Sequence, residues 1–202
     1  ADLEASTVKL AGRIALTCRA EEGAGRCEIS AKGETAAASA LRALAKASQL
    51  HLSTVEFTAR WALDEEKHRQ LRFSARRGEP WGRFKARMRS ADGRKGQALV
   101  VTPDSSAFRI ARSAVSGVAK HGPVRMRLNA RSEGVLSKAA MALASLQEAA
   151  SPEGGLGARL RCVAAETQDG SLVFVDIFAA DAAGAGAARG APAAGAAGGA
   201  DG

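Results

Sequence analysis

The chain contains one stretch of sequence twice, and this repeat limits how it can fold. ISAKGETAAASALRALAKASQL begins at Ile29, and LNARSEGVLSKAAMALASLQEA begins at Leu128. At this offset of 99 residues, Lys32 aligns with Arg131. Further along, Ala43 aligns with Ala142 and Leu44 with Leu143. Domains commonly contain 50 to 200 residues, so a unit that occurs twice in 202 residues predicts two small domains of similar fold.

The second copy predicts strands and helices in the order β-α-β-α-β-β. Its helical segments place apolar residues three and four positions apart, and its strands are β-branched or alternate apolar and polar residues with period two. The segments in chain order are ALVVT, AFRIARSAVSGVAKHG, VRMRLN, GVLSKAAMALASLQEAA, ARLRCVAA and SLVFVDIF. We therefore expect an α/β protein of the α+β sandwich type.

The first copy follows the same order without its opening strand. The expected elements are a helix over residues 7–22, a strand over 27–31, a helix over 35–48, and two strands over 55–62 and 70–76. We expect either that the copy is truncated upstream of Ala1 or that it is degenerate, with another element replacing the edge strand. A missing strand leaves an exposed sheet edge.

The chain is thus expected to divide into four parts. A first repeat covers residues 1–77, a basic linker 78–97, and a second repeat 98–178. The tail over residues 179–202 is rich in Ala and Gly and has no apolar periodicity, which predicts disorder.

The second copy resembles the stage V sporulation protein S family, whose members have an Alba-like fold. The resemblance covers its first strand, small polar turn and first helix, and its second helix, where GVLSKAAM resembles the family's G-A-L-N-Q-A-V-K-A motif. GETAAASALRALA of the first copy resembles the same motif. The resemblance implies two tandem β-α-β-α-β-β domains, each with two helices against a four-stranded sheet, in a superfamily that binds DNA or RNA. Since family members typically carry one domain and are often dimeric, we expect an intramolecular pseudo-dimer or a homo-oligomer.

The charge of the chain favours an anionic partner. Lys and Arg number 29 against 21 Asp and Glu, which gives a formal charge of +8 and a pI near 10.0. The linker is the most basic segment, and Trp81 or Phe84 within it could stack on an unpaired base. Three other interpretations stay open: Trp81 anchors the linker to a domain, the charges are simply solvated, or the basic run is a sorting signal.

Basic residues of the repeats are also candidate phosphate ligands. Lys32 and Arg131 precede the second helix of each copy, where backbone amides and a cationic side chain together can bind a phosphate. Arg125 and Arg127 alternate with core residues, so they project from one sheet face. The predicted nucleic-acid-binding residues are Trp81 and the basic residues Lys32, Arg42, Arg83, Lys85, Arg87, Arg89, Arg109, Arg112, Arg125, Arg127, Arg131 and Lys138.

The sequence does not predict an enzyme, a metal site or another cofactor. His51, His68 and His121 share no ligand spacing with each other or with the cysteines. The acids at positions 64–66 are expected to point in different directions from a solvated turn. No GxSxG, Walker-type loop or GxGxxG motif after a strand occurs.

The cysteines and the hydropathy pattern bear on the compartment. Cys18, Cys27 and Cys162 are odd in number, lack CxxC spacing and have apolar neighbours, which predicts buried reduced thiols. This favours an intracellular reducing compartment, the cytoplasm or the nucleus. No apolar run approaches the roughly 20 residues that cross a bilayer, so we expect no membrane partner.

These observations lead to two hypotheses. The first is a nucleic-acid-binding protein, largely sequence-nonspecific, that contacts phosphates through Arg and Lys of both repeats and the linker. RNA is placed slightly ahead of DNA because nothing resembles a groove-reading helix. The alternative is a regulatory or scaffolding module that acts through protein contacts and oligomerisation.

Overall fold

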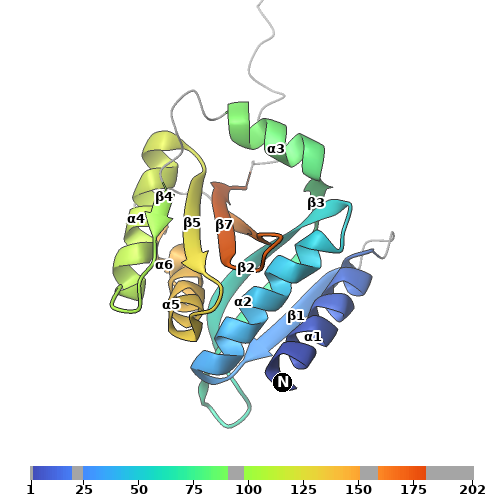
Figure 1. The fold of residues 1–202 in the computed structure, drawn as a ribbon. Helices are drawn as coiled ribbons and strands as arrows, with labels where there is room; N and C mark the ends of the chain where they lie inside the picture. Colours follow the sequence, from blue (N-terminus) through green and yellow to red (C-terminus); the bar gives the residue numbers. More distant parts are fainter. Residues whose placement is uncertain (1, 20–24, 91–97, 151–158, 181–202) are drawn as a thin grey trace, which may run out of the picture.

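The computed structural model describes residues 2–19, 25–90, 98–150 and 159–180, which form a mixed α/β fold (Figure 1). The expectation of an α/β sandwich is confirmed. In chain order the elements are α1 (Asp2–Arg19), β1 (Arg26–Ala31), α2 (Gly33–Gln49), β2 (Ser53–Leu63), β3 (Arg69–Pro80), α3 (Trp81–Ser90), β4 (Ala98–Val100), α4 (Ala107–His121), β5 (Val124–Asn129), α5 (Glu133–Ala144), α6 (Leu146–Ala149), β6 (Leu160–Glu166) and β7 (Leu172–Ala179).

The described strands form one seven-stranded sheet in the order β1-β3-β2-β6-β7-β5-β4. All neighbours pair antiparallel except β4 and β5, which are parallel. The strands β1, β3 and β2 come from the first repeat, and β6, β7, β5 and β4 come from the second. Pairing of β2 with β6 therefore joins the two repeats into a continuous sheet.

The second repeat has the expected element order, and β5 matches the predicted segment VRMRLN residue for residue. The first repeat begins with α1, and no strand precedes this helix in the described residues. Within the part of the chain that the structure describes, β1 therefore pairs with β3 alone and forms one edge of the sheet. The other edge, β4, has only three residues.

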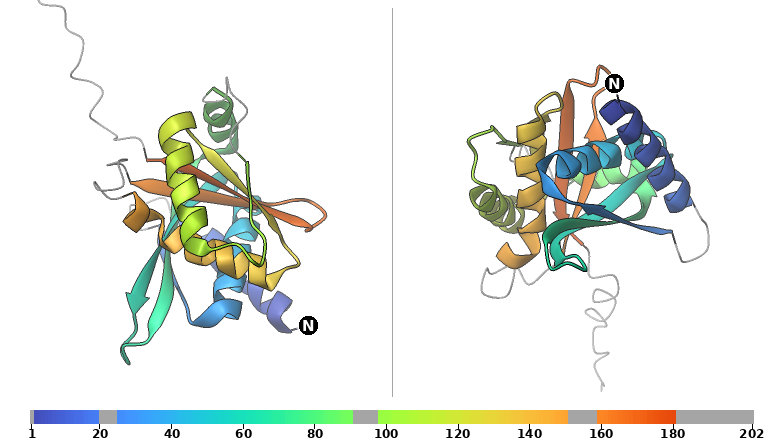
Figure 2. Two further views of the ribbon diagram at one scale, coloured as in Figure 1. Left: turned by 90° about the vertical axis from the view of Figure 1, so that its left-hand side faces the viewer. Right: turned by 90° about the horizontal axis from the view of Figure 1, so that it is seen from below.

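The long helices α1, α2, α4 and α5 lie on one face of the sheet (Figure 2). The apolar faces of α2 and α5 consist largely of alanine, and Ala40, Ala43, Ala139 and Ala140 are at most 2% exposed. Small side chains let two helices approach each other and the sheet closely. The helix α2 packs against α5, so the two repeats meet in the helical layer as well as in the sheet.

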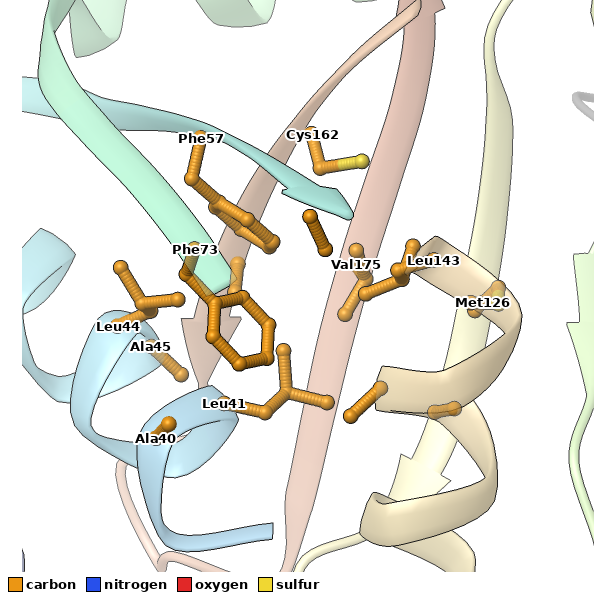
Figure 3. Packing of buried hydrophobic residues seen from close by; sticks show 14 of the residues in the cluster. Ala40, Leu41, Leu44, Ala45, Phe57, Phe73, Met126, Leu143, Cys162 and Val175 are labelled. Atoms are coloured by element: carbon orange, nitrogen blue, oxygen red, sulfur yellow. The ribbon is translucent and has the colours of Figure 1, made fainter. Parts of the chain in front are cut away.

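One hydrophobic core contains residues of both repeats (Figure 3). Leu41, Phe57 and Phe73 of the first repeat lie near Leu143 and Val175 of the second. The rings of Phe57 and Phe73 are tilted against each other, with centroids 6.3 Å apart. Because this core crosses the boundary between the repeats, the packing of each repeat depends on the other.

The segment expected as a linker contains regular structure. Residues 78–80 complete β3, and Trp81–Ser90 form α3. Trp81, Phe84 and Met88 have helical spacing and pack together at one end of the sheet, which explains the helix. Residues 91–97 of that segment, and the predicted disordered tail from residue 181 on, lie outside the described residues.

None of the described helices is both long enough and apolar enough to pass through a membrane.

Candidate nucleic-acid interface

The sheet face opposite the long helices carries a row of charged side chains. Strand alternation produces this face, because in β5 the even-numbered Val124, Met126 and Leu128 are buried and Arg125 and Arg127 between them are exposed. Strand pairing extends the same alternation across the sheet. We call this surface the outer face, and its main residues are Arg26, Glu28, Glu56, Thr58, Arg60, Arg72, Ser74, Arg76, Arg125, Arg127, Arg161, Val163, Phe174, Asp176 and Phe178.

The two most buried carboxylates of the outer face form ion pairs with arginines. Glu56, which is 8% exposed, accepts hydrogen bonds from Arg76 at 3.0 Å and from Arg161 at 2.7 Å. Asp176 accepts a bidentate pair from Arg125, with distances of 2.7 and 2.9 Å. Such charge-assisted pairs fix the guanidinium groups in place.

The other outer-face arginines lack such partners. Within the described residues, Arg26, Arg60, Arg72 and Arg127 form no ion pair with a carboxylate. Three of them are exposed and Arg72 is half-buried. Since these guanidinium groups are accessible and unpaired, the outer face can bind an anion without first breaking an internal ion pair.

An aromatic ring lies among these charges. Phe174 is half-buried on the outer face, pairs across strands with Arg127, and lies beneath the Arg125 guanidinium at 5.4 Å from the ring centroid. Aromatic rings beside cationic side chains are the usual platform for stacking of unpaired bases. Phe174 was not among the residues predicted from the sequence, because it occurs in a strongly apolar strand.

The aromatic residues that were selected in the expected linker have structural roles. Phe84 is 2% exposed and packs on Phe178 and Val163, so the hypothesis that it stacks on a base is wrong. Trp81 is half-buried, and its Nε1 donates to the carbonyl oxygen of Ser48 at 3.1 Å. These contacts are those of the anchor that the sequence analysis left open for Trp81.

Two basic residues in the first turns of α3 are exposed near this anchor. Arg83 and Lys85 are exposed, and Lys85 Nζ lies 6.0 Å from the Trp81 ring centroid. Arg87 and Arg89 belong to α3, but their side chains lie outside the described part of the structure. The basic character of α3 thus extends the positive charge of the sheet at one end.

The predicted phosphate sites at Lys32 and Arg131, where a strand leads into a helix, each have a carboxylate nearby. Lys32 Nζ pairs with Asp64 Oδ2 at 2.7 Å, while Arg131 is exposed. The first turn of α2 carries Glu34, and that of α5 carries Glu133. A carboxylate in the first turn competes with a phosphate for the positive end of the helix.

Two further predicted residues lie within the helical layer. Arg42 in α2 pairs with Glu166 at 3.3 Å and with Glu4 at 3.7 Å, and its side chain is 26% exposed. Lys138 in α5 is half-buried. The contacts of Arg42 connect α1, α2 and β6, so they stabilise the fold.

Arg109 and Arg112 are exposed on α4, on the helical side of the molecule. The Arg112 guanidinium lies 5.8 Å from the centroid of Phe108. The structure therefore separates these two arginines from Arg125 and Arg127, which lie on the outer face.

Several arginines of the outer face were missed by sequence reasoning. The same alternation that identified Arg125 and Arg127 occurs in VEFTARWA, QLRFSAR and ARLRCVAA, and it could have identified these residues. The missed residues of these segments are Arg60, Arg72, Arg76 and Arg161 on the outer face and Arg159 beside it, and Arg26 of RCEISA was missed as well.

A cavity opens on the outer face where the two repeats meet. The strands β2 and β6 pair only at Glu56 with Val163 and at Phe57 with Cys162. Beyond these residues a cavity of about 250 Å³ lies between the strands. Its lining contains Glu56 and five arginines, which are Arg26, Arg60, Arg76, Arg159 and Arg161.

The hairpin between β2 and β3 gathers three possible metal ligands. Contrary to expectation, its acids do not all point apart, because Asp64 and Glu66 both approach His68 Nδ1, at 3.7 and 3.2 Å. The hydrogen bond from Lys32 lowers the pKa of Asp64. Since Lys32 already pairs with Asp64, and Glu66 and His68 are 72% exposed, this is an ion-pair cluster to which we assign no metal.

The three cysteines are free thiols. Burial raises the pKa of Cys18 to about 11 and raises the pKa values of Cys27 and Cys162 as well. A thiol with a raised pKa carries little thiolate at neutral pH and is a poor nucleophile. These residues therefore do not form a reactive site.

No family model, curated protein or solved structure matches the chain.

Proposed function

We propose that the protein binds nucleic acid through the outer face, largely without sequence preference. The observation that carries this proposal is the group of accessible arginines Arg26, Arg60, Arg72 and Arg127, which have no carboxylate partner in the described residues. Guanidinium groups bind phosphates in a bidentate manner and release condensed counterions. Contacts of this type position a strand without reading its bases.

The shape of the outer face favours unpaired strands. A recognition helix enters the major groove of a duplex, whereas this surface is a sheet with a half-buried ring, Phe174, between arginines. Bases of a single strand can stack on such a ring while arginines hold the backbone. Single strands are therefore placed ahead of duplexes, and RNA keeps the slight preference over DNA that the absence of a groove-reading helix gave it.

The repeat organisation supports the same proposal. The resemblance of both copies to the stage V sporulation protein S family, with its Alba-like fold, implies a nucleic-acid-binding superfamily. Joining two copies in one sheet places the arginines of both repeats on one surface. Linked binding surfaces raise the affinity for a long polyanion through effective concentration.

The test is fluorescence anisotropy with single-stranded RNA, single-stranded DNA and duplex DNA between about 50 and 200 mM salt. The R72A/R127A variant removes two outer-face arginines that lie outside the cavity. The matched control, R109A/R112A, removes the same charge from α4. We expect the outer-face variant to reduce the slope of log K against log salt by about two, and the control to leave it nearly unchanged.

Two results would count against this proposal. If the α4 variant lost affinity and the outer-face variant did not, the interface would lie on the helical side. If no ligand bound at low salt, the charge would be ordinary surface, and the alternative of a scaffolding module would be preferred.

A further inference from the structure

The cavity at the repeat junction has a structural cause. Continuing the register of β2 and β6 would place Thr58 opposite Arg161 and Arg60 opposite Arg159, but the strands do not pair there. The gap is lined by Gln147 of α6, whose Nε2 donates to the carbonyl oxygen of Leu160 at 2.8 Å. The cavity therefore extends from the outer face toward the helical layer.

The charge of the cavity lining is strongly unbalanced. Glu56 faces five arginines and is the one carboxylate among the described lining residues. It holds Arg76 of the first repeat and Arg161 of the second, so both guanidinium groups are oriented at the cavity wall. The remaining three, Arg26, Arg60 and Arg159, have no carboxylate partner in the described residues.

The neutral residues of the lining, like its arginines, can bind an anionic ligand. Thr58 and Ser74 add hydroxyl groups to the lining, and hydroxyl groups can donate hydrogen bonds to phosphate oxygens. At about 250 Å³ the cavity is slightly smaller than the usual pocket for a drug-sized molecule. This volume suits a phosphate group together with part of the group that carries it.

We infer that this cavity binds a phosphate monoester, presented either by the phosphorylated end of a nucleic-acid strand or by a free nucleotide. A monoester carries a charge of about −1.5 to −2 at pH 7, whereas each diester inside a strand carries one negative charge. A cavity with a surplus of arginines over carboxylates favours the more highly charged group. Binding of a phosphorylated strand end rests on the proposed function, whereas binding of a free nucleotide does not.

The first measurement uses one single-stranded RNA sequence in three forms, with hydroxyl ends, with a 5′-phosphate and with a 3′-phosphate, in buffer free of phosphate and sulfate. We expect at least one phosphorylated form to bind about tenfold more tightly than the hydroxyl form. The R60A/R159A variant, which breaks no ion pair with a carboxylate of the described residues, should abolish this preference. R72A/R127A should weaken all forms and keep the preference.

The second measurement is isothermal titration calorimetry of the full chain with adenosine 5′-monophosphate, with adenosine as the uncharged control. Binding of the monophosphate that is lost in R60A/R159A supports the inference even if no RNA binds, and would identify the free nucleotide as the ligand. If RNA bound with no preference for phosphorylated ends and the monophosphate did not bind, the inference would be wrong and the proposed function would stand. A preference that survived R60A/R159A would equally overturn the assignment to this cavity.

Discussion

The two halves of the outer face use the same strand arrangement differently. In the first repeat, Arg26 and Arg60 are exposed without a carboxylate partner in the described residues. In the second repeat, Arg127 is exposed in the same way, but Arg125 is held by Asp176, and Phe178 is covered by α3. The alternation of the strands makes both halves project charged side chains, joined in the second half by Val163, Phe174 and Phe178, but only tertiary contacts decide whether the charged side chains remain free to bind.

The buried carboxylates Glu56 and Asp176 also differ between the two halves of the outer face. Glu56 pairs with Arg76 of its own repeat and with Arg161 of the other, whereas Asp176 pairs with Arg125 of its own repeat. Glu56 thus contributes to the junction of the repeats, and Asp176 stabilises one pair of neighbouring strands. The predictions below test whether the halves differ as these contacts suggest.

The largest effect on stability is expected where α3 covers the second-repeat half of the outer face. Phe84 is 2% exposed and packs on Val163 and Phe178, so Phe84→Ala leaves a cavity and should lower the free energy of unfolding by about 3 kcal/mol. Urea denaturation followed by circular dichroism measures this change. Arg83→Ala, at an exposed position of the same helix, should stay within about 0.5 kcal/mol of the parent. A loss below about 1 kcal/mol for Phe84→Ala would show that α3 is not firmly docked.

A smaller effect is expected for the two carboxylates. Glu56→Gln removes the charge shared by two guanidinium groups, whose side chains are 49% and 26% exposed. Breaking a fully buried pair costs about 3–5 kcal/mol, and partial exposure reduces the expected cost here to about 1–2 kcal/mol. Asp176→Asn removes one pair to Arg125, which is 52% exposed, and should cost about 1 kcal/mol or less. The same denaturation experiment compares them, and an Asp176→Asn variant that is the less stable of the two would contradict the ranking.

The smallest effect is expected from a histidine of the first repeat. His51 is buried, whereas His121 of the second repeat is exposed. Burial, followed by the charges of Arg77 and Arg19, lowers the pKa of His51 below 6.5. Its Nδ1 accepts a hydrogen bond from the Ser53 amide at 3.1 Å, which requires the neutral ring.

The sign of the pH dependence follows from this lowered pKa. Between the folded and unfolded pKa values the unfolded chain binds more protons, so stability is complete above about pH 6.5 and is lost as pH falls toward the folded pKa. One group contributes at most about 1.4 kcal/mol per pH unit in that window. Thermal unfolding of His51→Gln between about pH 7.5 and 5 should show a shallower loss than the parent, while His121→Gln should match the parent. Equal slopes for the parent and His51→Gln would exclude this role.

Much of the fold could be predicted from the sequence because its signals are local. The period of two in VRMRLN identified β5, with Arg125 and Arg127 on its exposed side. Helical spacing of small apolar residues identified α2, α4 and α5. These periodicities depend on backbone geometry within a segment, so they persist whatever the segment packs against.

The helix α3 and the site at the repeat junction depended on distant contacts. Trp81 and Phe84 lie in a very basic segment, and their helix becomes evident once Phe178 of a remote strand covers Phe84. The sequence by itself determined the order of the strands and main helices within each repeat and the alternation that exposes the arginines. The tertiary structure alone decided that β2 pairs with β6, that Glu56 holds Arg161, and that a cavity opens beside them, because strand pairing between residues about 100 positions apart is not encoded in any local period.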